Sequence, residues 1–191
     1  MGGGEKFRST DEGSIDKYLG VNIEQLDGGS FEMSQPFFIE RITTLLGIEN
    51  DHTGEKITPV DKPLLNKDLN GVPRKYQWNY CAAIGMLTYL IGSVRPNIVM
   101  AVHQCARFSK KQIHLHEQTV TKTGRYLIGS KTEGIVYNLD KSKGWKVYVD
   151  ANFDGGWDPD NSLDANMLYS CTGFVICYVS CPVLWTRKLQ T

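Results

Sequence analysis

Lys146-Val-Tyr-Val-Asp-Ala-Asn-Phe-Asp-Gly155 is the stretch around which the rest of the chain can be arranged. Its apolar residues alternate with polar ones, so an extended strand would carry an apolar row on one face and Asp150 on the other. An acid at the end of a buried strand, followed by a pair of glycines, is a candidate metal ligand. The stretch therefore predicts a strand, with Asp150 as the residue that carries chemistry.

Two more strands are predicted after this one. Segment 172–179 is apolar on both faces, which is typical of a central strand with layers on both sides, and 182–189 is its expected partner. With 145–152 they predict an antiparallel three-stranded sheet at the C-terminal end. Residues 145–191 contain no helical pattern, so either the preceding helices cover this sheet or the chain is a fragment.

The N-terminal region predicts a hairpin followed by a short helix. Strand-like segments 18–24 and 31–33 flank a glycine turn at 26–30. Ser34 is suited to cap the N-terminus of a helix, and the apolar stripe of that helix ends at Gly47.

Three helices and a strand are predicted in the middle of the chain, after a polar connection over 48–75. Apolar residues at helical spacing run from about 77 to 91, from 96 to 108 and from 114 to 128, and a strand follows at 134–139. The third helix is expected to turn an apolar face inward and a polar face outward. The inward residues are Leu115, Val120, Thr123 and Leu127, and the outward ones are Gln118, Lys122 and Arg125.

The fold class predicted by this pattern is α+β, in three units. A hairpin-helix unit covers residues 1–60, a helical region covers 61–140, and a three-stranded sheet covers 145–191.

The composition fits a soluble globular protein. The 191 residues are 41% hydrophobic, no apolar run is long enough to span a bilayer, and the N-terminus lacks the segments of a secretory signal. Five cysteines without a C-x-x-C pair suit a reducing compartment. We therefore expect an intracellular protein, cytoplasmic or nuclear, without a membrane partner. Buried free thiols are favoured over a zinc site built from Cys171, Cys177, Cys181 and His103.

The net charge of zero hides a segregation of charge. Residues 107–131 hold six Lys or Arg and one acid, whereas 140–164 hold six Asp and three Lys. Antiparallel neighbouring helices would join the basic residues into one phosphate-binding surface, which a metal-dependent enzyme acting on nucleic acid would need. Solvated faces, and cations favoured near helix C-termini, explain the same residues without a ligand. The candidate nucleic-acid-binding residues are Arg107, Lys110, Lys111, Lys122 and Arg125.

Asp150-x-Asn152-x-Asp154-Gly155 also matches the opening of an EF-hand calcium loop. The match breaks at the twelfth position, where Asn161 replaces the bidentate Glu, and the flanks predict strand and loop where helices are required. Ordinary use of Asp, Asn and Gly in a loop explains the segment better, so calcium binding is the lesser alternative.

A series of short motifs follows one order along most of the chain. Each is weak alone, but their ordered succession is specific. They are Tyr18-Leu-Gly-Val21, Met33-Ser-Gln-Pro36, Tyr80-Cys-Ala-Ala-Ile-Gly-Met-Leu-Thr-Tyr-Leu90, Arg95-Pro-Asn-Ile98, Ala101-Val-His-Gln-Cys-Ala-Arg-Phe108, Gly124-Arg-Tyr-Leu127, Tyr148-Val-Asp-Ala151, Thr172-Gly-Phe-Val175 and Trp185 to Thr191. With these motifs the chain resembles the Pol polyprotein of copia-type retrotransposons, from the end of the reverse transcriptase palm through the thumb and connection into ribonuclease H.

The resemblance implies that Asp150 matches the first carboxylate of a ribonuclease H site, which holds two Mg²⁺ ions and cleaves RNA in an RNA/DNA hybrid. It also implies that Lys122 and Arg125 lie toward the phosphates of a bound hybrid or single strand. The rest of the Pol polyprotein is the implied protein partner.

Several positions depart from the family pattern. Asn152 stands where a second acid is usual, Thr121 and Thr123 stand at usually basic positions, and Cys171 stands where Ser or Arg is common. The polymerase Tyr-x-Asp-Asp motif and the Glu-containing helix of ribonuclease H are missing. We therefore expect a polyprotein fragment that is inactive by itself, with Mg²⁺ weakly held or absent. A non-catalytic nucleic-acid-binding remnant is the alternative.

Overall fold

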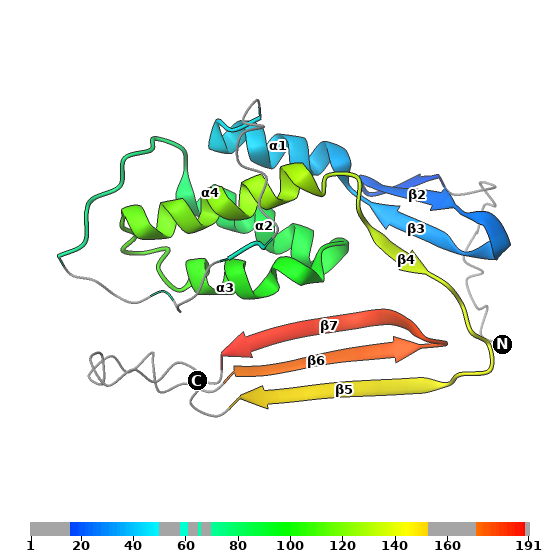
Figure 1. Cartoon of the computed structure of the whole chain (residues 1–191). Helices are drawn as coiled ribbons and strands as arrows, with labels where there is room; N and C mark the ends of the chain where they lie inside the picture. The colour runs from blue at the N-terminus through cyan, green and yellow to red at the C-terminus, as the bar shows by residue number, and fades with distance from the viewer. Residues whose placement is uncertain (1–15, 50–57, 61–64, 66–69, 153–170, 190–191) are drawn as a thin grey trace, which may run out of the picture.

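The computed structural model describes residues 16–49, 58–60, 65, 70–152 and 171–189 (Figure 1). Within these residues, helices and two antiparallel sheets make an α+β fold, as predicted. The predicted division into three units stays a prediction.

In chain order the elements are β1 (Lys17–Tyr18), β2 (Val21–Gln25), η1 (Asp27–Gly29), β3 (Phe31–Ser34), α1 (Pro36–Leu46), α2 (Tyr80–Ser93), η3 (Pro96–Ile98), α3 (Val99–Ala106), α4 (His114–Gly129), β4 (Ile135–Tyr137), β5 (Trp145–Asn152), β6 (Cys171–Tyr178) and β7 (Cys181–Leu189).

The first sheet joins the N-terminal hairpin to a strand much later in the chain. Its order is β1-β2-β3-β4, and β4 pairs with β3 so that Phe31 lies opposite Tyr137. The rings of these two residues stack with their centroids 4.9 Å apart. The sequence predicted β4 as a strand, but it did not predict that this strand pairs with β3.

Helix α1 starts differently from the prediction, because Ser34 does not cap it. Ser34 is the last residue of β3 and pairs with Asn22, so Gln35 takes the N-cap position without a side-chain hydrogen bond to the helix. Pro36 is the first helical residue. An N–H at this position has no partner within the helix, so the missing N–H of proline costs no hydrogen bond. The helix ends at Gly47 in the left-handed conformation (φ 67°), as predicted.

Helices α1 to α4 pack against one another and enclose the main hydrophobic core of the described chain. Helix α2 begins at Tyr80, slightly after the predicted start, because the Asn79 side chain accepts a hydrogen bond from the N–H of Ala82 at 3.0 Å. The Tyr80 hydroxyl donates to the carbonyl of Cys105 at 2.9 Å and ties α2 to α3. Core side chains that are fully buried include Ile39, Ile42, Leu87, Leu90, Ile98, Val102 and Leu127.

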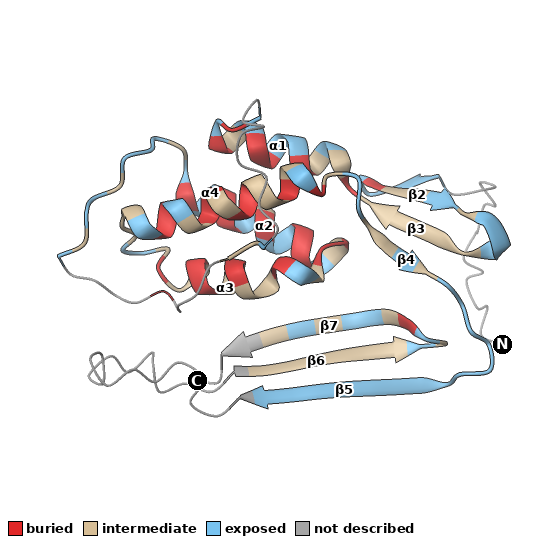
Figure 2. Ribbon diagram, viewed as in Figure 1, coloured by how far each residue is buried: buried red, intermediate tan, exposed pale blue. Residues whose placement is uncertain are grey.

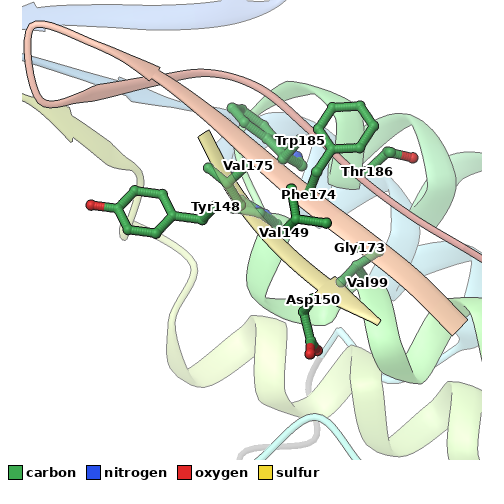
Figure 3. A pocket seen from close by; sticks show the side chains of 10 residues that line it. Val99, Tyr148, Val149, Asp150, Gly173, Phe174, Val175, Trp185 and Thr186 are labelled. Carbon is green, nitrogen blue, oxygen red and sulfur yellow. The ribbon is translucent and has the colours of Figure 1, made fainter. Parts of the chain in front are cut away.

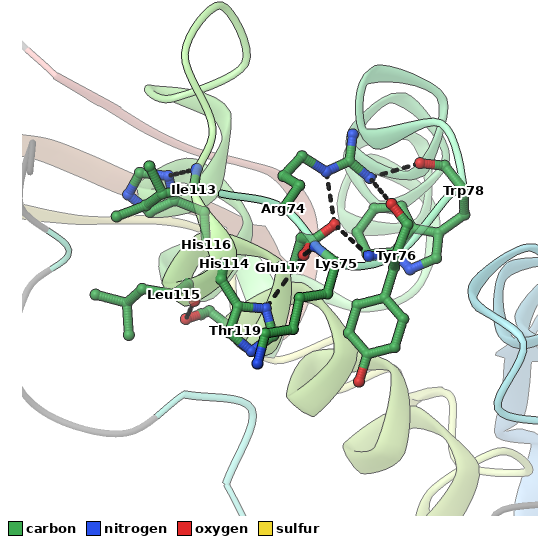
Figure 4. Close-up of polar contacts among 10 residues, drawn as sticks. All are labelled: Arg74, Lys75, Tyr76, Trp78, Ile113, His114, Leu115, His116, Glu117 and Thr119. Carbon is green, nitrogen blue, oxygen red and sulfur yellow. Dashed lines mark hydrogen bonds and ion pairs between the residues drawn. The ribbon is translucent and has the colours of Figure 1, made fainter. Parts of the chain in front are cut away.

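Helix α4 buries a face that differs in part from the prediction. Val120, Thr123 and Leu127 are buried as expected, but Leu115 is 48% exposed and Glu117 is fully buried. The inward position of Leu115 is therefore wrong. The segment that precedes α2 packs against this end of α4 and offers Glu117 polar partners (Figure 4).

Glu117 is the centre of a buried polar cluster. Its carboxylate accepts hydrogen bonds from Arg74 Nε at 2.6 Å, the Lys75 N–H at 2.8 Å and the Tyr76 N–H at 3.3 Å, and it lies 3.3 Å from His114 Nδ1. Burial alone would raise the pKa of this carboxyl, but the Lys75 N–H, Arg74 and His114 together hold the pKa below its usual value. Glu117 is the one acid of segment 107–131, and because it is buried in this cluster its charge is not on the surface of the protein.

The second sheet has the order β5-β6-β7, so β6 is central as predicted. The β7 edge lies nearest the helices, where α3 contacts it and Trp185 Nε1 donates to the carbonyl of Ile91 at 2.8 Å (Figure 1). Strand β5 lies farthest from the helices. Residues 172–177 of β6 are only half-buried, so the predicted cover on both faces of this strand is not reached in the described structure.

None of the helices in the parts of the chain that the structure describes is long and apolar enough to cross a lipid bilayer.

Candidate nucleic-acid interface

Asp150 lies near the end of β5, which is an exposed edge strand (Figure 2). Residues 145–151 are all exposed, with Val147 60% and Val149 69% accessible. The prediction of a buried strand carrying the acid is therefore wrong. The physical reason is that the helices contact the β7 side of the sheet, and β5 lies beyond their cover.

A groove of about 250 Å³ lies between the second sheet and the start of α3, and Asp150 is at its rim (Figure 3). The Asp150 carboxylate points away from the rings that line the groove. The other lining residues are Pro96, Val99, Tyr148, Val149, Gly173, Phe174, Val175, Trp185 and Thr186. These side chains carry no carboxylate, so the groove itself provides no second acid for a metal ion.

The described residues do not fit a two-metal site around Asp150. Two Mg²⁺ ions need several carboxylates, and no group of three His, Cys, Asp or Glu that could hold a metal occurs in the described residues. Segment 150–152 is extended strand, whereas Asp154 and the rest of the predicted calcium loop lie outside the described residues. Asp150 thus belongs to no group of three metal-ligating side chains in the ranges that the structure describes.

Cys81, Cys105, Cys177 and Cys181 are free thiols. Cys105 and Cys181 are buried as predicted, whereas Cys81 is exposed and Cys177 is half-buried, so the predicted burial is wrong for these two. Burial raises the pKa of Cys105 to about 12, so this thiol is not reactive near neutral pH. The zinc alternative gains no support, because the metal-ligating side chains described by the structure, including His103, form no group of three.

The predicted basic residues lie along α3, α4 and the turn that joins these two packed helices. Lys110 and Lys111 are exposed in the turn. Arg107 is half-buried and donates to Gln104 Oε1 at 3.1 Å. Lys122 and Arg125 are half-buried on the face of α4 that also carries the exposed Gln118, as predicted. Because Glu117 is buried, this segment presents cations without an acid of its own. Their binding to nucleic acid stays a prediction.

A second groove, which the sequence reasoning missed, lies at the start of α1. Its volume is about 410 Å³, and it is formed by the β1–β2 turn, α1 and α2. Cations and aromatic rings line it together. The lining residues are Lys17, Leu19, Gly20, Gln35, Phe37, Phe38, Arg41 and Tyr89. We call it the α1 groove.

The rings of the α1 groove are paired with its cations. Lys17 Nζ lies 5.1 Å from the centroid of the Phe37 ring, and the Arg41 guanidinium lies 5.6 Å from that of Phe38. Phe38 in turn packs edge-on against Tyr89 at 5.0 Å. Phe37 and Tyr89 are nevertheless 62% and 46% exposed, so both retain surface for a ligand. The spacing of Phe37 and Arg41, one helical turn apart, was the signal in the sequence.

Two further features of the α1 groove are unusual. Leu19, in the β1–β2 turn, has φ of 48°, which is uncommon outside glycine, and its carbonyl accepts a hydrogen bond from the Tyr89 hydroxyl at 3.2 Å. Gln35 is 1% exposed, and its Oε1 has no hydrogen-bond partner in the described structure. A buried acceptor without a donor costs free energy, so a ligand that brings a donor would gain from this position.

The sequence is similar, over nearly its whole length, to proteins encoded by retrotransposons. It is 25% identical over 186 residues to a Saccharomyces cerevisiae protein named for transposon Ty5-1, YCL074W, covering 95% of this chain and 56% of that protein. It is 26% identical over 197 residues to the retrovirus-related Pol polyprotein from transposon TNT 1-94 of Nicotiana tabacum, covering 97% of this chain and 14% of the polyprotein.

The chain thus spans just over half of the first relative and a small part of the second. No family model matches the chain, and no solved structure matches it. The similarity supports the prediction of a retrotransposon polyprotein fragment.

Proposed function

We propose that the chain is a nucleic-acid-binding part of a copia-type retrotransposon Pol polyprotein, at the junction of reverse transcriptase and ribonuclease H. Its ligand is an RNA/DNA hybrid or a single strand. The observation that carries the proposal is the α1 groove, where exposed rings lie beside cations. Cations that follow a backbone and rings that stack on bases are the usual components of a single-strand site.

Five side chains of the α1 groove have roles in this proposal. Phe37 and Tyr89 stack on unpaired bases, because each has exposed ring surface. Lys17 and Arg41 contact phosphates, a role that is independent of base sequence. Gln35 Oε1 accepts a hydrogen bond from a sugar hydroxyl or a base amino group, which would satisfy the buried acceptor.

The basic residues of α3 and α4 extend the same function. Lys110, Lys111, Lys122 and Arg125 would hold the phosphates of a longer duplex, without reading its bases. The burial of Glu117 supports this role, because it removes the nearest acid in the sequence from the surface.

Asp150 is proposed as one of several Mg²⁺ ligands in the complete polyprotein, with the remaining ligands outside the described residues. The Tyr148-Val-Asp-Ala151 motif supports this assignment. We expect the chain by itself to bind nucleic acid without cleaving it, since a single carboxylate holds Mg²⁺ loosely. The test is incubation of a labelled hybrid with the chain and Mg²⁺. Cleavage by the chain that is lost in Asp150→Asn would contradict the expectation.

Fluorescence anisotropy with labelled single strands and hybrids tests the binding site. Phe37→Ala should weaken single-strand binding by about tenfold, since stacking on one base is lost. Lys17→Gln with Arg41→Gln should weaken all sequences alike and reduce the slope of log Kd against log salt by about one to two.

Two matched variants make this test specific. Lys143→Gln changes an exposed lysine in the turn before β5. This position lies outside the α1 groove and outside the basic residues of α3 and α4, so the affinity for nucleic acid should be unchanged. Lys110→Gln with Lys111→Gln should weaken hybrid binding more than single-strand binding. If Phe37→Ala and the Lys17/Arg41 variant bind as tightly as the parent chain, the α1 groove is not the site.

A further inference from the structure

Three stacked aromatic rings run from the helical core to the surface of the protein. Tyr80 is 1% exposed, and its hydroxyl ties α2 to α3. The Trp78 ring stacks on the Tyr80 ring with centroids 5.8 Å apart and an interplanar angle of 12°. Tyr76 stacks on Trp78 in turn, at 6.5 Å and 22°, and is 47% exposed. We call these three rings the aromatic ladder, which begins at a buried ring and ends at a ring with open surface.

The exposed ring of the aromatic ladder is held in place by its backbone and by its neighbours (Figure 4). The Tyr76 N–H donates to Glu117 Oε1 at 3.3 Å, and the Tyr76 carbonyl accepts from Arg74 Nη2 at 3.3 Å. The His114 ring flanks the Tyr76 ring, with centroids 6.2 Å apart. The Arg74 guanidinium also lies over the Trp78 ring, 5.0 Å from its centroid. A ring that is already ordered loses little conformational entropy when a ligand stacks on it.

The part of the chain that carries the aromatic ladder is strongly basic. Residues 70–132 hold nine Lys or Arg and one acid, Glu117. The Glu117 side chain is fully buried and paired with Arg74, so no carboxylate from this range lies on the surface. An exposed ring in positive surroundings suits a ligand that is both anionic and aromatic, and a single-stranded nucleic acid has both properties.

Three exposed lysines lie on the segments that border the aromatic ladder. Lys75 directly precedes the exposed ring, and Lys110 and Lys111 lie in the turn before α4. The His114 N–H donates to the Val72 carbonyl at 2.9 Å, so the start of α4 lies beside the segment that carries the ladder. Cations near an exposed ring can contact the phosphates that flank a stacked base.

We infer that Tyr76 is a second base-stacking site, which holds one unpaired base of a single strand while Lys75 contacts the adjoining phosphate. The inference rests on the proposed function, because it adds a contact to the same ligand. The site is separate from the α1 groove, since neither Tyr76 nor Lys75 lines that groove. A base on Tyr76 extends the aromatic ladder outward by one ring, and stacking of this kind is tolerant of base sequence.

Fluorescence anisotropy of the whole chain with labelled oligothymidylate tests the site. Tyr76→Ala should raise the Kd by about tenfold because one stacked base is lost, whereas Tyr76→Phe keeps the ring and should bind like the parent chain. Lys75→Gln should reduce the slope of log Kd against log salt by about one. Tyr178→Ala is the matched control, since Tyr178 is 44% exposed and lies on β6, outside both stacking sites. This control should leave the Kd unchanged.

Two further measurements separate stacking on Tyr76 from a general loss of structure. A blunt RNA/DNA hybrid has no unpaired bases, so Tyr76→Ala should leave the Kd for this hybrid nearly unchanged. A single strand that carries iodouracil should form a photochemical crosslink to Tyr76, which mass spectrometry of the labelled peptide identifies. Circular dichroism confirms that each variant is folded.

The inference and the proposed function can fail separately. If Phe37→Ala weakens binding of oligothymidylate and Tyr76→Ala does not, the second stacking site is wrong and the α1 groove stands. If Tyr76→Ala weakens binding of the single strand and the blunt hybrid equally, stacking on an unpaired base is also wrong. The reverse result, with an effect of Tyr76→Ala alone, supports the second site and contradicts the α1 groove. A parent chain that binds no nucleic acid overturns both.

Discussion

Arg74 and Glu117 form an ion pair, with 2.6 Å between Arg74 Nε and Glu117 Oε1. The Glu117 side chain is fully buried, whereas the Arg74 side chain keeps 22% of its surface exposed. The Arg74 guanidinium also lies 5.0 Å from the Trp78 ring and donates to the Trp78 carbonyl at 2.6 Å. The pair therefore fastens the segment before α2 to the first turns of α4.

Replacing Glu117 by Gln should destabilise the fold by about 3 kcal/mol, because the Arg74 charge loses its partner within a partly buried cluster. Urea unfolding followed by tryptophan fluorescence measures this change. Glu40→Gln is the matched control, since Glu40 is 52% exposed and its partner Lys131 is 37% exposed, and it should change stability by less than about 1 kcal/mol. If both variants lowered the free energy of unfolding equally, the burial of Glu117 would not be the cause of its contribution to stability.

The lowered pKa of Glu117 predicts how stability depends on pH. Burial raises this pKa, but donors from Lys75, Arg74 and His114 outweigh it, so the folded pKa lies below the unfolded value. The stabilisation is then fully present above the unfolded pKa, near the usual 4.5 of a Glu, and is lost as the pH falls through the folded pKa. Urea midpoints should therefore fall with pH below the unfolded pKa. Glu117→Gln should show a shallower dependence, and an identical pH profile would contradict the assignment.

Gly134 is expected to tolerate no side chain. A Cβ at this position would lie 2.2 Å from the carbonyl oxygen of Met33, which is backbone and cannot move without disturbing the pairing of β3 with β4. Gly134→Ala should cost about 2 kcal/mol or more, measured by chemical unfolding. Gly144→Ala, where a Cβ meets open space, should be neutral within about 0.5 kcal/mol. A neutral Gly134→Ala would mean that β4 pairs with β3 less closely than the structure shows.

The β6–β7 turn stores backbone strain that a better sequence would relieve. Val179 and Ser180 have φ of 46° and 69°, values that favour Asn and Gly, and Val179 is β-branched. Val179→Asn with Ser180→Gly should stabilise the chain by about 1 kcal/mol and raise the Tm by about 2–4 °C. Val179→Ile keeps the unfavourable side chain and should give no gain. A lower Tm for the Asn-Gly variant would argue against a left-handed turn at this position.

The elements of the fold followed from local sequence, because periodicity, caps and breakers act within a few residues. The α2 stripe, the glycine end of α1 at Gly47 and the central apolar strand β6 were all predicted. The exceptions are positions where a tertiary contact competes with a local preference. Ser34 is a good cap by composition, yet pairing with Asn22 keeps it in β3. Leu115 fits an apolar stripe, yet it is 48% exposed while the next two residues, His116 and Glu117, are buried, because polar partners on the inner side of α4 accept these two side chains.

The candidate sites depended more strongly on tertiary structure. The basic residues of α3 and α4 were evident in the sequence, but the α1 groove was not, because it combines Lys17, Phe37 and Tyr89 from separate elements. Asp150 was evident as an acid on a strand, but its exposure was not, since this depends on which sheet edge the helices cover.

By itself, then, the sequence determined the helices, the strands, their order and the resemblance to retrotransposon polyproteins, since these depend on residue type and spacing. The tertiary structure alone decided that β4 joins β3, that Glu117 is buried against Arg74, and that β5 is an edge strand among the described strands. Each of these features depends on contacts between segments that are far apart in the sequence. Strand pairing and burial arise only from such contacts, so residue type and spacing do not predict them.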